Sequence, residues 1–264
     1  MKVLFIGDID AKPGRQATTA LLPDIRKHYA CDLVIANVEN VSHGKGVTRK
    51  ALDDIREAGV DVFTSGNHVW DKPEVFEIFN DPNYVLLRPA NYPHGTAGSG
   101  AKIIPLGDKK LLLINLQGRV FMHENLDDPF RTLEKLLKQY EKDVPDAIIV
   151  DFHAEVTSEK RAFGFFADGK VTAVVGTHTH VPTADAQILP KGTAYVTDLG
   201  MVGPKHAVLG VDKEIIMRQF LTQLPQRFET SEDPLQIFCS VLIEINTATK
   251  LAKHIERVDR EVKL

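Results

Sequence analysis

The chain has 264 residues, of which 43% are hydrophobic and 26% charged, and its formal net charge is −4. These values are typical of a globular protein with a sizeable core. The negative charge argues against a dedicated basic nucleic-acid surface, although RNA stays open as a partner. The longest apolar runs are too short for a membrane helix or a signal-peptide core, so we expect a soluble, cytoplasmic protein. Cys31 and Cys239 are expected to be buried free thiols.

Short apolar runs alternate with helical patterns through the first two thirds of the chain. The runs predict buried strands at 3–7, 33–37, 62–66, 147–152 and 171–177. Caps and apolar faces predict helices at 48–58, 73–79, 129–140, 158–167 and 213–223. Hairpins are expected at 102–115, 186–197 and 235–258. Since the strands come from separate regions of the chain, we expect an α/β fold with two packed sheets and outer helices. No linker or repeat divides it, so residues 1–264 are expected to form one domain.

Each of the five apolar runs is followed at once by side chains that can bind a metal. They are Asp8, Glu39 and Asn40, Asn67 and His68, His153, and His178 with His180. Open α/β sheets bind ligands beyond the carboxyl ends of their strands, so these side chains are expected to share one pocket. One such residue alone is more often structural, but the coincidence at five strand ends predicts a metal site. A mixed oxygen and nitrogen set without thiolates suits manganese, iron or zinc.

The charge of this ligand set favours a phosphate ester as substrate. Two divalent ions carry four positive charges, of which Asp8 and Glu39 would neutralise two, so the centre would attract an anion. Two ions about 3.5–4 Å apart can clamp both the attacking and the leaving oxygen of a phosphoryl group. If the segment from His178 to His180 is extended, both rings point the same way and can reach a metal pair.

Several motifs resemble those of calcineurin-like metallophosphoesterases, and the longer ones resemble the YmdB-type family. They are GD at 7–8, VEN at 38–40, GNH at 66–68, DFHAEVTSEK at 151–160, THTHVPTAD at 177–185 and TDLGMVGP at 197–204. The resemblance implies a four-layer α/β/β/α sandwich, with two mixed sheets flanked by helices. It also implies two metal ions, iron or manganese, and frequent homo-oligomers. The implied activity is the hydrolysis of 2′,3′-cyclic nucleotides to nucleoside monophosphates.

The resemblance also implies a role for each site residue. The first metal would be bound by Asp8, Glu39, Asn40 and His180, and the second by Glu39, Asn67, His153 and His178. A hydroxide held by the two metals would attack phosphorus. His68 would bind no metal and would protonate the leaving oxygen, because imidazole is well suited to proton transfer near neutral pH.

The sequence departs from the wider superfamily at two positions. Asp10 stands where a metal-binding histidine is usual, and we expect it to have a supporting role. Val69 follows His68 where an acid is common, so either Asp71 or Glu155 is expected to orient His68. A supporting role is also expected for Asp198. The alternatives to the cyclic-nucleotide activity are a broader phosphodiesterase or RNA-end nuclease, and a regulatory nucleotide-binding protein with incidental activity.

Overall fold

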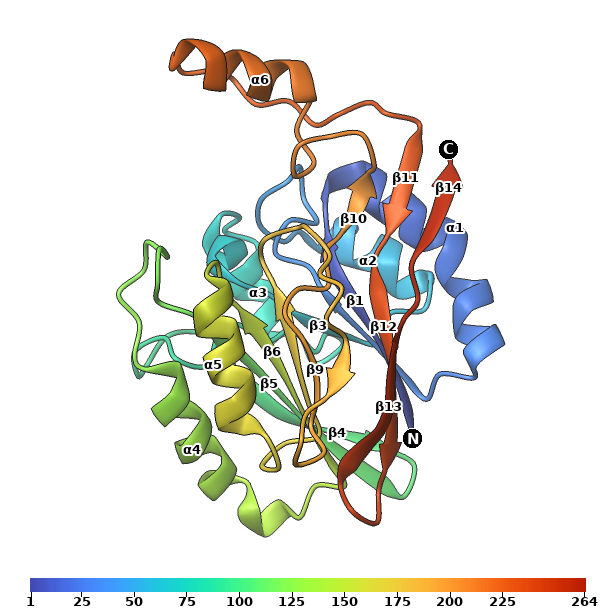
Figure 1. Ribbon diagram of the computed structural model, residues 1–264, viewed down its shortest axis with the longest axis vertical. Helices are drawn as coiled ribbons and strands as arrows, with labels where there is room; N and C mark the ends of the chain where they lie inside the picture. The colour runs from blue at the N-terminus through green and yellow to red at the C-terminus, as the bar shows by residue number, and fades with distance from the viewer.

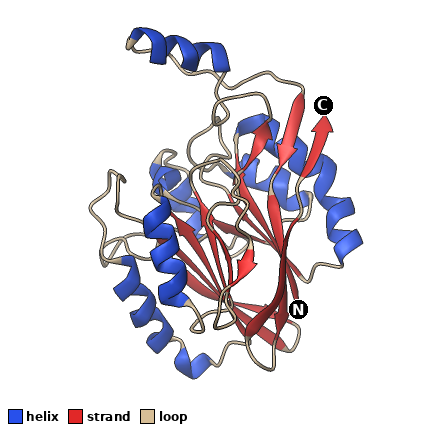
Figure 2. Cartoon of the chain, in the orientation of Figure 1, coloured by secondary structure: helices blue, strands red, loops and turns tan.

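The computed structural model describes residues 1–264 and consists of two β-sheets packed face to face, with helices on their outer faces (Figures 1 and 2). This arrangement confirms the predicted four-layer α/β/β/α sandwich. Along β1 (Lys2–Ile9) the side chains alternate between two cores. Leu4 and Ile6 face the helices, whereas Val3 and Phe5 face the other sheet. The strand is buried on both faces, which explains its uninterrupted apolar run.

The first sheet is organised around β1. One branch runs from β1 to β2 (Leu33–Asn37) and β3 (Val62–Thr64), all in parallel. The remaining strands come from the end of the chain: β10 (Met201–Pro204) pairs with the last residues of β1, and β12 (Ser240–Asn246) pairs with the first. The sheet is completed by β11 (Leu235–Phe238), β13 (Leu251–Arg257) and β14 (Arg260–Lys263).

The second sheet has a parallel centre and antiparallel edges. Its strand order is β4-β5-β6-β7-β9-β8. The parallel strands are β5 (Lys109–Gln117), β6 (Ala147–His153), β7 (Ala173–Thr177) and β9 (Ala194–Val196). The edges are β4 (Ala101–Leu106) and β8 (Gln187–Ile188). The predicted hairpins at 102–115 and 186–197 are therefore confirmed.

Helices cover both outer faces. The first sheet is covered by α1 (Ala11–Tyr29), α2 (Arg49–Glu57) and α3 (Val75–Asn80), and the second by α4 (Pro129–Gln139) and α5 (Thr157–Ala167). Two short 3-10 helices complete the chain: η1 (Asn67–Trp70) precedes α3, and η2 (Glu141–Asp143) follows α4. The predicted helices are confirmed. Asp128 illustrates why α4 begins where it does, since its carboxylate accepts hydrogen bonds from the N–H groups of Phe130 and Arg131.

Two parts of the chain differ from the prediction. Helix α1 is the longest helix, yet no element is predicted there from the sequence, because Pro13, Gly14 and Pro23 interrupt the helical pattern. Gly14 lies there because a Cβ would meet the carbonyl oxygen of Val202. The predicted run at 235–246 is not one strand: it divides at Cys239 into β11 and β12, which pair with different partners. Both cysteines are buried and free, as expected.

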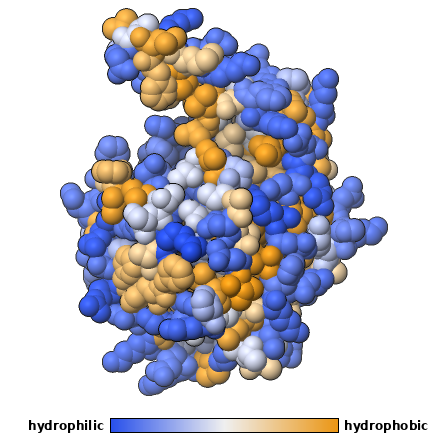
Figure 3. Space-filling view, in the orientation of Figure 1, coloured by the Kyte–Doolittle hydropathy of each residue, from blue (hydrophilic) through white to orange (hydrophobic).

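Helix α6 (Lys213–Thr222) stands away from the rest of the molecule (Figure 1). It is the predicted amphipathic helix, and its N-terminus is capped by the carboxylate of Asp212. None of its residues is buried. Figure 3 shows apolar residues gathered on this protruding arm. No helix of the molecule is both long enough and apolar enough to span a membrane.

Candidate metal centre

The predicted site residues meet where the carboxyl ends of strands from both sheets come together. Asp8, Glu39 and Asn67 follow or end β1, β2 and β3 of the first sheet, and the histidines follow or end β6 and β7 of the second. A cavity of about 520 Å³ opens over them and is lined by Glu39, Asn40, His68, His178 and His180, among others. Five of the predicted site residues therefore line one cavity between the two sheets, whereas Asp8, Asn67 and His153 do not line it but are linked to this group by close contacts.

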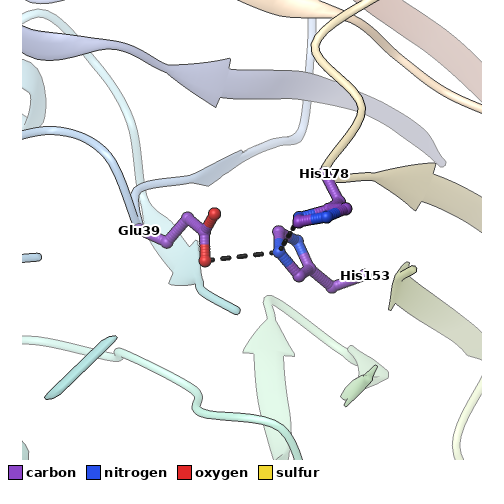
Figure 4. Close-up of side chains that lie close together, drawn as sticks. All are labelled: Glu39, His153 and His178. Atoms are coloured by element: carbon purple, nitrogen blue, oxygen red, sulfur yellow. Dashed lines mark hydrogen bonds and ion pairs between the residues drawn. The ribbon is translucent and has the colours of Figure 1, made fainter. Parts of the chain in front are cut away.

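Glu39, His153 and His178 form the centre of the site (Figure 4). Their nearest ligand atoms all lie within 4.8 Å of one another. The Nε2 atom of His153 lies 3.3 Å from Oε2 of Glu39 and 3.0 Å from Nδ1 of His178. Lone pairs from one carboxylate and two imidazoles converge here, and this is a donor set that iron, manganese or zinc accepts. These three side chains can hold a metal ion.

Asn67 joins this cluster directly. Its Oδ1 atom lies 3.1 Å from Nε2 of His153. The approach depends on Gly66, because a Cβ at that position would lie 2.2 Å from Nε2 of His153 and 2.4 Å from Oε2 of Glu39. The glycine of the GNH motif therefore has a packing reason: only a residue without a side chain lets η1 come this close to the site.

Asp8, Asn40 and His180 adjoin the cluster and carry buried atoms without partners. Asp8 Oδ2 accepts a hydrogen bond from the backbone N–H of His178, and Asn40 Nδ2 lies 2.8 Å from Nε2 of His180. Asp8 Oδ1, Asn40 Oδ1 and His180 Nδ1 have no hydrogen-bond partner although they are buried. Unpaired buried polar atoms are costly, and a cation would satisfy the lone pairs of such atoms. The residues present therefore fit a metal centre.

The ionisation of the cluster supports the same conclusion. Burial raises the pKa of Asp8 well above its usual range and lowers the pKa of His178 to about 3. Burial opposes charge on His153, but the carboxylates of Glu39, Asp8 and Asp151 together outweigh it and raise the pKa of His153 to about 9. Burial would raise the pKa of Glu39, but its contacts with His153 and His68 lower it to about 2. A proton on His153 thus neutralises Glu39, and a metal cation would do so in its place.

A buried chain of hydrogen bonds holds the His153 ring. Its Nδ1 atom lies 2.9 Å from the hydroxyl of Thr177, which donates to Asp151 Oδ1 at 2.7 Å. Asp151 also accepts from the hydroxyl of Thr64 and the amide of Asn37. Such a partner on the far ring nitrogen fixes the orientation of a metal-binding histidine. These supporting residues were not predicted, although Asp151 and Thr177 lie within the quoted motifs.

The segment from His178 to His180 is not extended, so the condition under which both rings would point the same way is not met. Both histidines have positive φ angles, 102° and 63°. The turn is held because the N–H of Thr179 donates to Oδ2 of Asp198, which also pairs with the buried Lys160 ammonium at 2.5 Å. This contact confirms the expected supporting role of Asp198. In an extended strand, the side chains of residues 178 and 180 would point to the same face. The positive φ angles of the two histidines remove that constraint.

The structure shows which of the two acids proposed to orient His68 contacts its ring. Asp71 Oδ2 lies 3.0 Å from Nδ1 of His68, on the same 3-10 turn. Glu155 instead lies 3.0 Å from Nε2 of His178. The acid that contacts His68 is therefore Asp71. Glu155 contacts Nε2 of His178 instead.

Asp10 and the loop at 43–46 complete the wall of the cavity. Asp10 is buried at the N-cap position of α1, but its side chain accepts no hydrogen bond from the N–H groups of the helix. Burial raises the pKa of this carboxyl to about 7. It lines the cavity together with His43, Gly44 and Lys45. The exposed Lys45 adds a cation at the mouth of the site, where it would attract an anionic substrate.

Comparisons with known proteins agree with this geometry. The family model of the YmdB-like proteins matches residues 4–258. A 2′,3′-cyclic-nucleotide 2′-phosphodiesterase from Bacillus subtilis (strain 168) is 48% identical over 259 residues, which cover 98% of this chain and 96% of that protein. The crystal structure of a novel phosphatase from Mycoplasma pneumoniae has a TM-score of 0.93 and 37% identity, covering 100% of this chain and 94% of that chain.

A more distant likeness concerns the fold alone. The NAD nucleotidase of Haemophilus influenzae matches with a TM-score of 0.59 and 14% identity, covering 100% of this chain and 56% of that chain. The two closer matches and the family model, by contrast, extend over nearly the whole length of the chain. On these grounds the chain belongs to the YmdB-like protein family.

Proposed function

We propose that the protein is a metal-dependent phosphodiesterase that hydrolyses 2′,3′-cyclic nucleotides to nucleoside monophosphates. The observation that carries this proposal is the convergence of Glu39, His153 and His178 beside three buried atoms without partners. Burying such atoms without partners is costly, and a bound cation would offset that cost. The substrate follows from the Bacillus subtilis relative, which is a 2′,3′-cyclic-nucleotide 2′-phosphodiesterase.

The residues support two metal ions, iron or manganese, with a shared carboxylate. In this assignment one ion would be held by Asp8, Glu39, Asn40 and His180, and the other by Glu39, Asn67, His153 and His178. When bound, such a pair supplies Lewis acidity to a phosphate and lowers the pKa of water. The partnerless atoms of Asp8, Asn40 and His180 support the first set. The contacts of Nε2 of His153 with Glu39, Asn67 and His178 support the second.

His68 is proposed to protonate the leaving oxygen of the ribose. Its ring lines the cavity and is only partly buried, so it can exchange protons with water. Asp71 contacts Nδ1, which leaves Nε2 for the substrate. A carboxylate in this position stabilises the protonated ring and fixes its direction. Cleavage of the 2′ ester would then give the 3′-monophosphate.

A panel of phosphodiesters tests this function. The purified protein is assayed with 2′,3′-cyclic AMP, a short RNA and an aryl phosphodiester, with and without a chelator. We expect 2′,3′-cyclic AMP to have the highest kcat/KM, and the chelator to abolish its turnover. A higher kcat/KM on the RNA or the aryl ester would favour a nuclease or a broader phosphodiesterase. Nucleotide binding without turnover would favour a regulatory protein.

We also propose that the chain forms a homo-oligomer through α6. An isolated ten-residue helix is marginally stable in water, and most helices depend on packing of an apolar face. On α6 and just beyond it, Phe220, Leu221 and Leu224 are largely exposed. Static light scattering of the wild-type protein and of Leu221→Asp tests this assembly. We expect an oligomer that dissociates in the variant, and a monomeric wild-type protein would contradict it.

A further inference from the structure

The cavity over the candidate metal centre has a second wall that comes from a different part of the chain. This wall is formed by residues 209–211 before α6 and by residues 226–230 after it. The other lining residues are mostly polar or charged. The only three hydrophobic residues of the cavity, Leu209, Val211 and Phe228, all lie on this wall. The cavity therefore has a polar floor, and its apolar side chains are confined to the outer wall, which also carries Gln226, Glu229 and Thr230.

Backbone pairing holds this outer wall in place. Val208 and Val211 form an antiparallel bridge, and Val211 forms another with Thr230. The N–H of Asp212 donates to the carbonyl of Glu229, and the N–H of Ser231 donates to the carbonyl of Gly210, both at 2.9 Å. The two segments of the wall are thus fixed against each other as a small antiparallel sheet.

Leu209 has a backbone conformation that leucine rarely adopts. It has φ 53° and Gly210 has φ 89°, at the tip of the two-residue turn between Val208 and Val211. Turns with two positive φ angles strongly prefer Asn-Gly, because a residue with a branched or bulky side chain is disfavoured there. The leucine is also 49% exposed. Leu209 thus places an apolar side chain in the lining of the cavity, at a backbone position that does not favour leucine.

Phe228 is the second exposed apolar residue of this wall. It is 54% exposed, and it carries the only aromatic ring of the cavity lining that is not a histidine. An aromatic ring facing a cavity binds flat apolar groups, and nucleobases stack on such rings whatever their sequence.

We propose that Leu209 and Phe228 form an apolar subsite for the nucleobase of the substrate. This inference rests on the proposed function, since it takes the substrate to be a 2′,3′-cyclic nucleotide. In that ligand the base and the cyclic phosphate lie on opposite sides of the ribose. With the phosphate at the floor beside His68 and His178, the base extends toward the outer wall. Because stacking does not read the base edges, the subsite accepts purines and pyrimidines alike.

The test compares two substrates that differ only in the base. One is 2′,3′-cyclic AMP, and the other is methyl riboside 2′,3′-cyclic phosphate, in which a methoxy group replaces adenine. The measured quantity is the ratio of their kcat/KM values, for wild type, Phe228→Ala and Leu209→Asn. Asparagine suits the positive φ angle better than leucine, so this variant keeps the turn while removing the apolar surface. Phe165→Ala is the matched control, because Phe165 is 51% exposed on α5 and outside the cavity.

We expect Phe228→Ala to lower the ratio roughly five- to hundredfold, through KM, and Leu209→Asn to lower it by a smaller factor. The control should keep the wild-type ratio. Calorimetric titration with adenosine 3′-monophosphate and with ribose 3-phosphate gives a second readout, in which Phe228→Ala should weaken only the first. Equal losses on both substrates, or none, would overturn the subsite. A wild-type enzyme that hydrolysed neither substrate would overturn the proposed function, and the subsite with it.

Discussion

The two histidines proposed for different tasks lie in opposite surroundings. His153 is completely buried behind Glu39 and His178, which line the floor of the cavity; its ring contacts Thr177, which donates in turn to Asp151. His68 lies at the rim with 28% of its side chain exposed; its ring contacts Asp71, and its backbone N–H donates to Glu39. The floor is fixed by a hydrogen-bond network within the core, whereas the ring of His68 is held by one partly exposed contact with a carboxylate.

This difference in burial matches the two proposed roles, metal binding for His153 and proton transfer for His68. A metal ligand needs a fixed direction and protection from water, and a buried network supplies both. A residue that transfers protons needs access to water and to the substrate, so partial exposure suits it. The predictions below test this division, and they run from the largest expected effect to the smallest.

Removing the buried ring behind the floor should have the largest effect. In His153→Ala both the metal content and the turnover should fall, with activity reduced on the order of a thousandfold or more, because the metal supplies most of the charge stabilisation. Metal analysis and initial rates measure the two quantities. His254→Ala is the control, because His254 is exposed on β13. This variant should keep the wild-type metal content and turnover. Full metal content with full activity in His153→Ala would contradict the assignment.

Removing the ring at the rim should lower turnover while leaving the metals bound. In His68→Ala we expect kcat to fall about 10²–10⁴-fold, the usual contribution of general acid catalysis. Metal analysis of the same preparation should give the wild-type content. If His68→Ala loses its metals, or turns over like wild type, the rim residue has a different role.

Breaking the network under the floor should have an intermediate effect. Thr177→Val keeps the shape of the side chain but removes the hydroxyl that joins His153 to Asp151. Loss of such a support typically lowers metal affinity or activity about 10–100-fold. Titration of the chelated protein with Mn²⁺ measures the affinity. An unchanged affinity would show that the network does not act on the metal ligands.

Weakening the ion pair at the rim should have the smallest effect. Asp71→Asn removes the charge beside His68, and a partly exposed pair contributes at most about 1 kcal/mol, so kcat should fall roughly fivefold with the metals retained. Glu155→Gln is the informative comparison, because Glu155 contacts His178. It should change metal affinity more than Asp71→Asn does. The reverse pattern would exchange the roles of the two acids.

Much of the fold could be predicted from the sequence, because the buried strands are short apolar runs with clear boundaries. Helix α1 could not, since its prolines and glycine disrupt the pattern while tertiary packing still forms the helix. The convergence of the site could be predicted, because strand ends meet in an α/β fold. The turn at 178–180 could not, since its positive φ angles depend on contacts with Asp198, distant in sequence.

The supporting contacts of the site were also beyond prediction. Asp71 and Glu155 are both acids near a histidine in sequence, and only their positions in space show which histidine each contacts. The outer wall with Leu209 and Phe228 lies outside the motifs that carry the predicted ligands. No local pattern relates these apolar residues to the site, because pairing of 208–212 with 229–231 brings them there.

The most direct test of the central proposal is the metal content of the purified protein, measured together with hydrolysis of 2′,3′-cyclic AMP before and after chelation. The proposed centre predicts close to two transition-metal ions per chain, loss of turnover as they are removed, and recovery when Mn²⁺ or Fe²⁺ is returned. Full turnover by metal-free protein would contradict it.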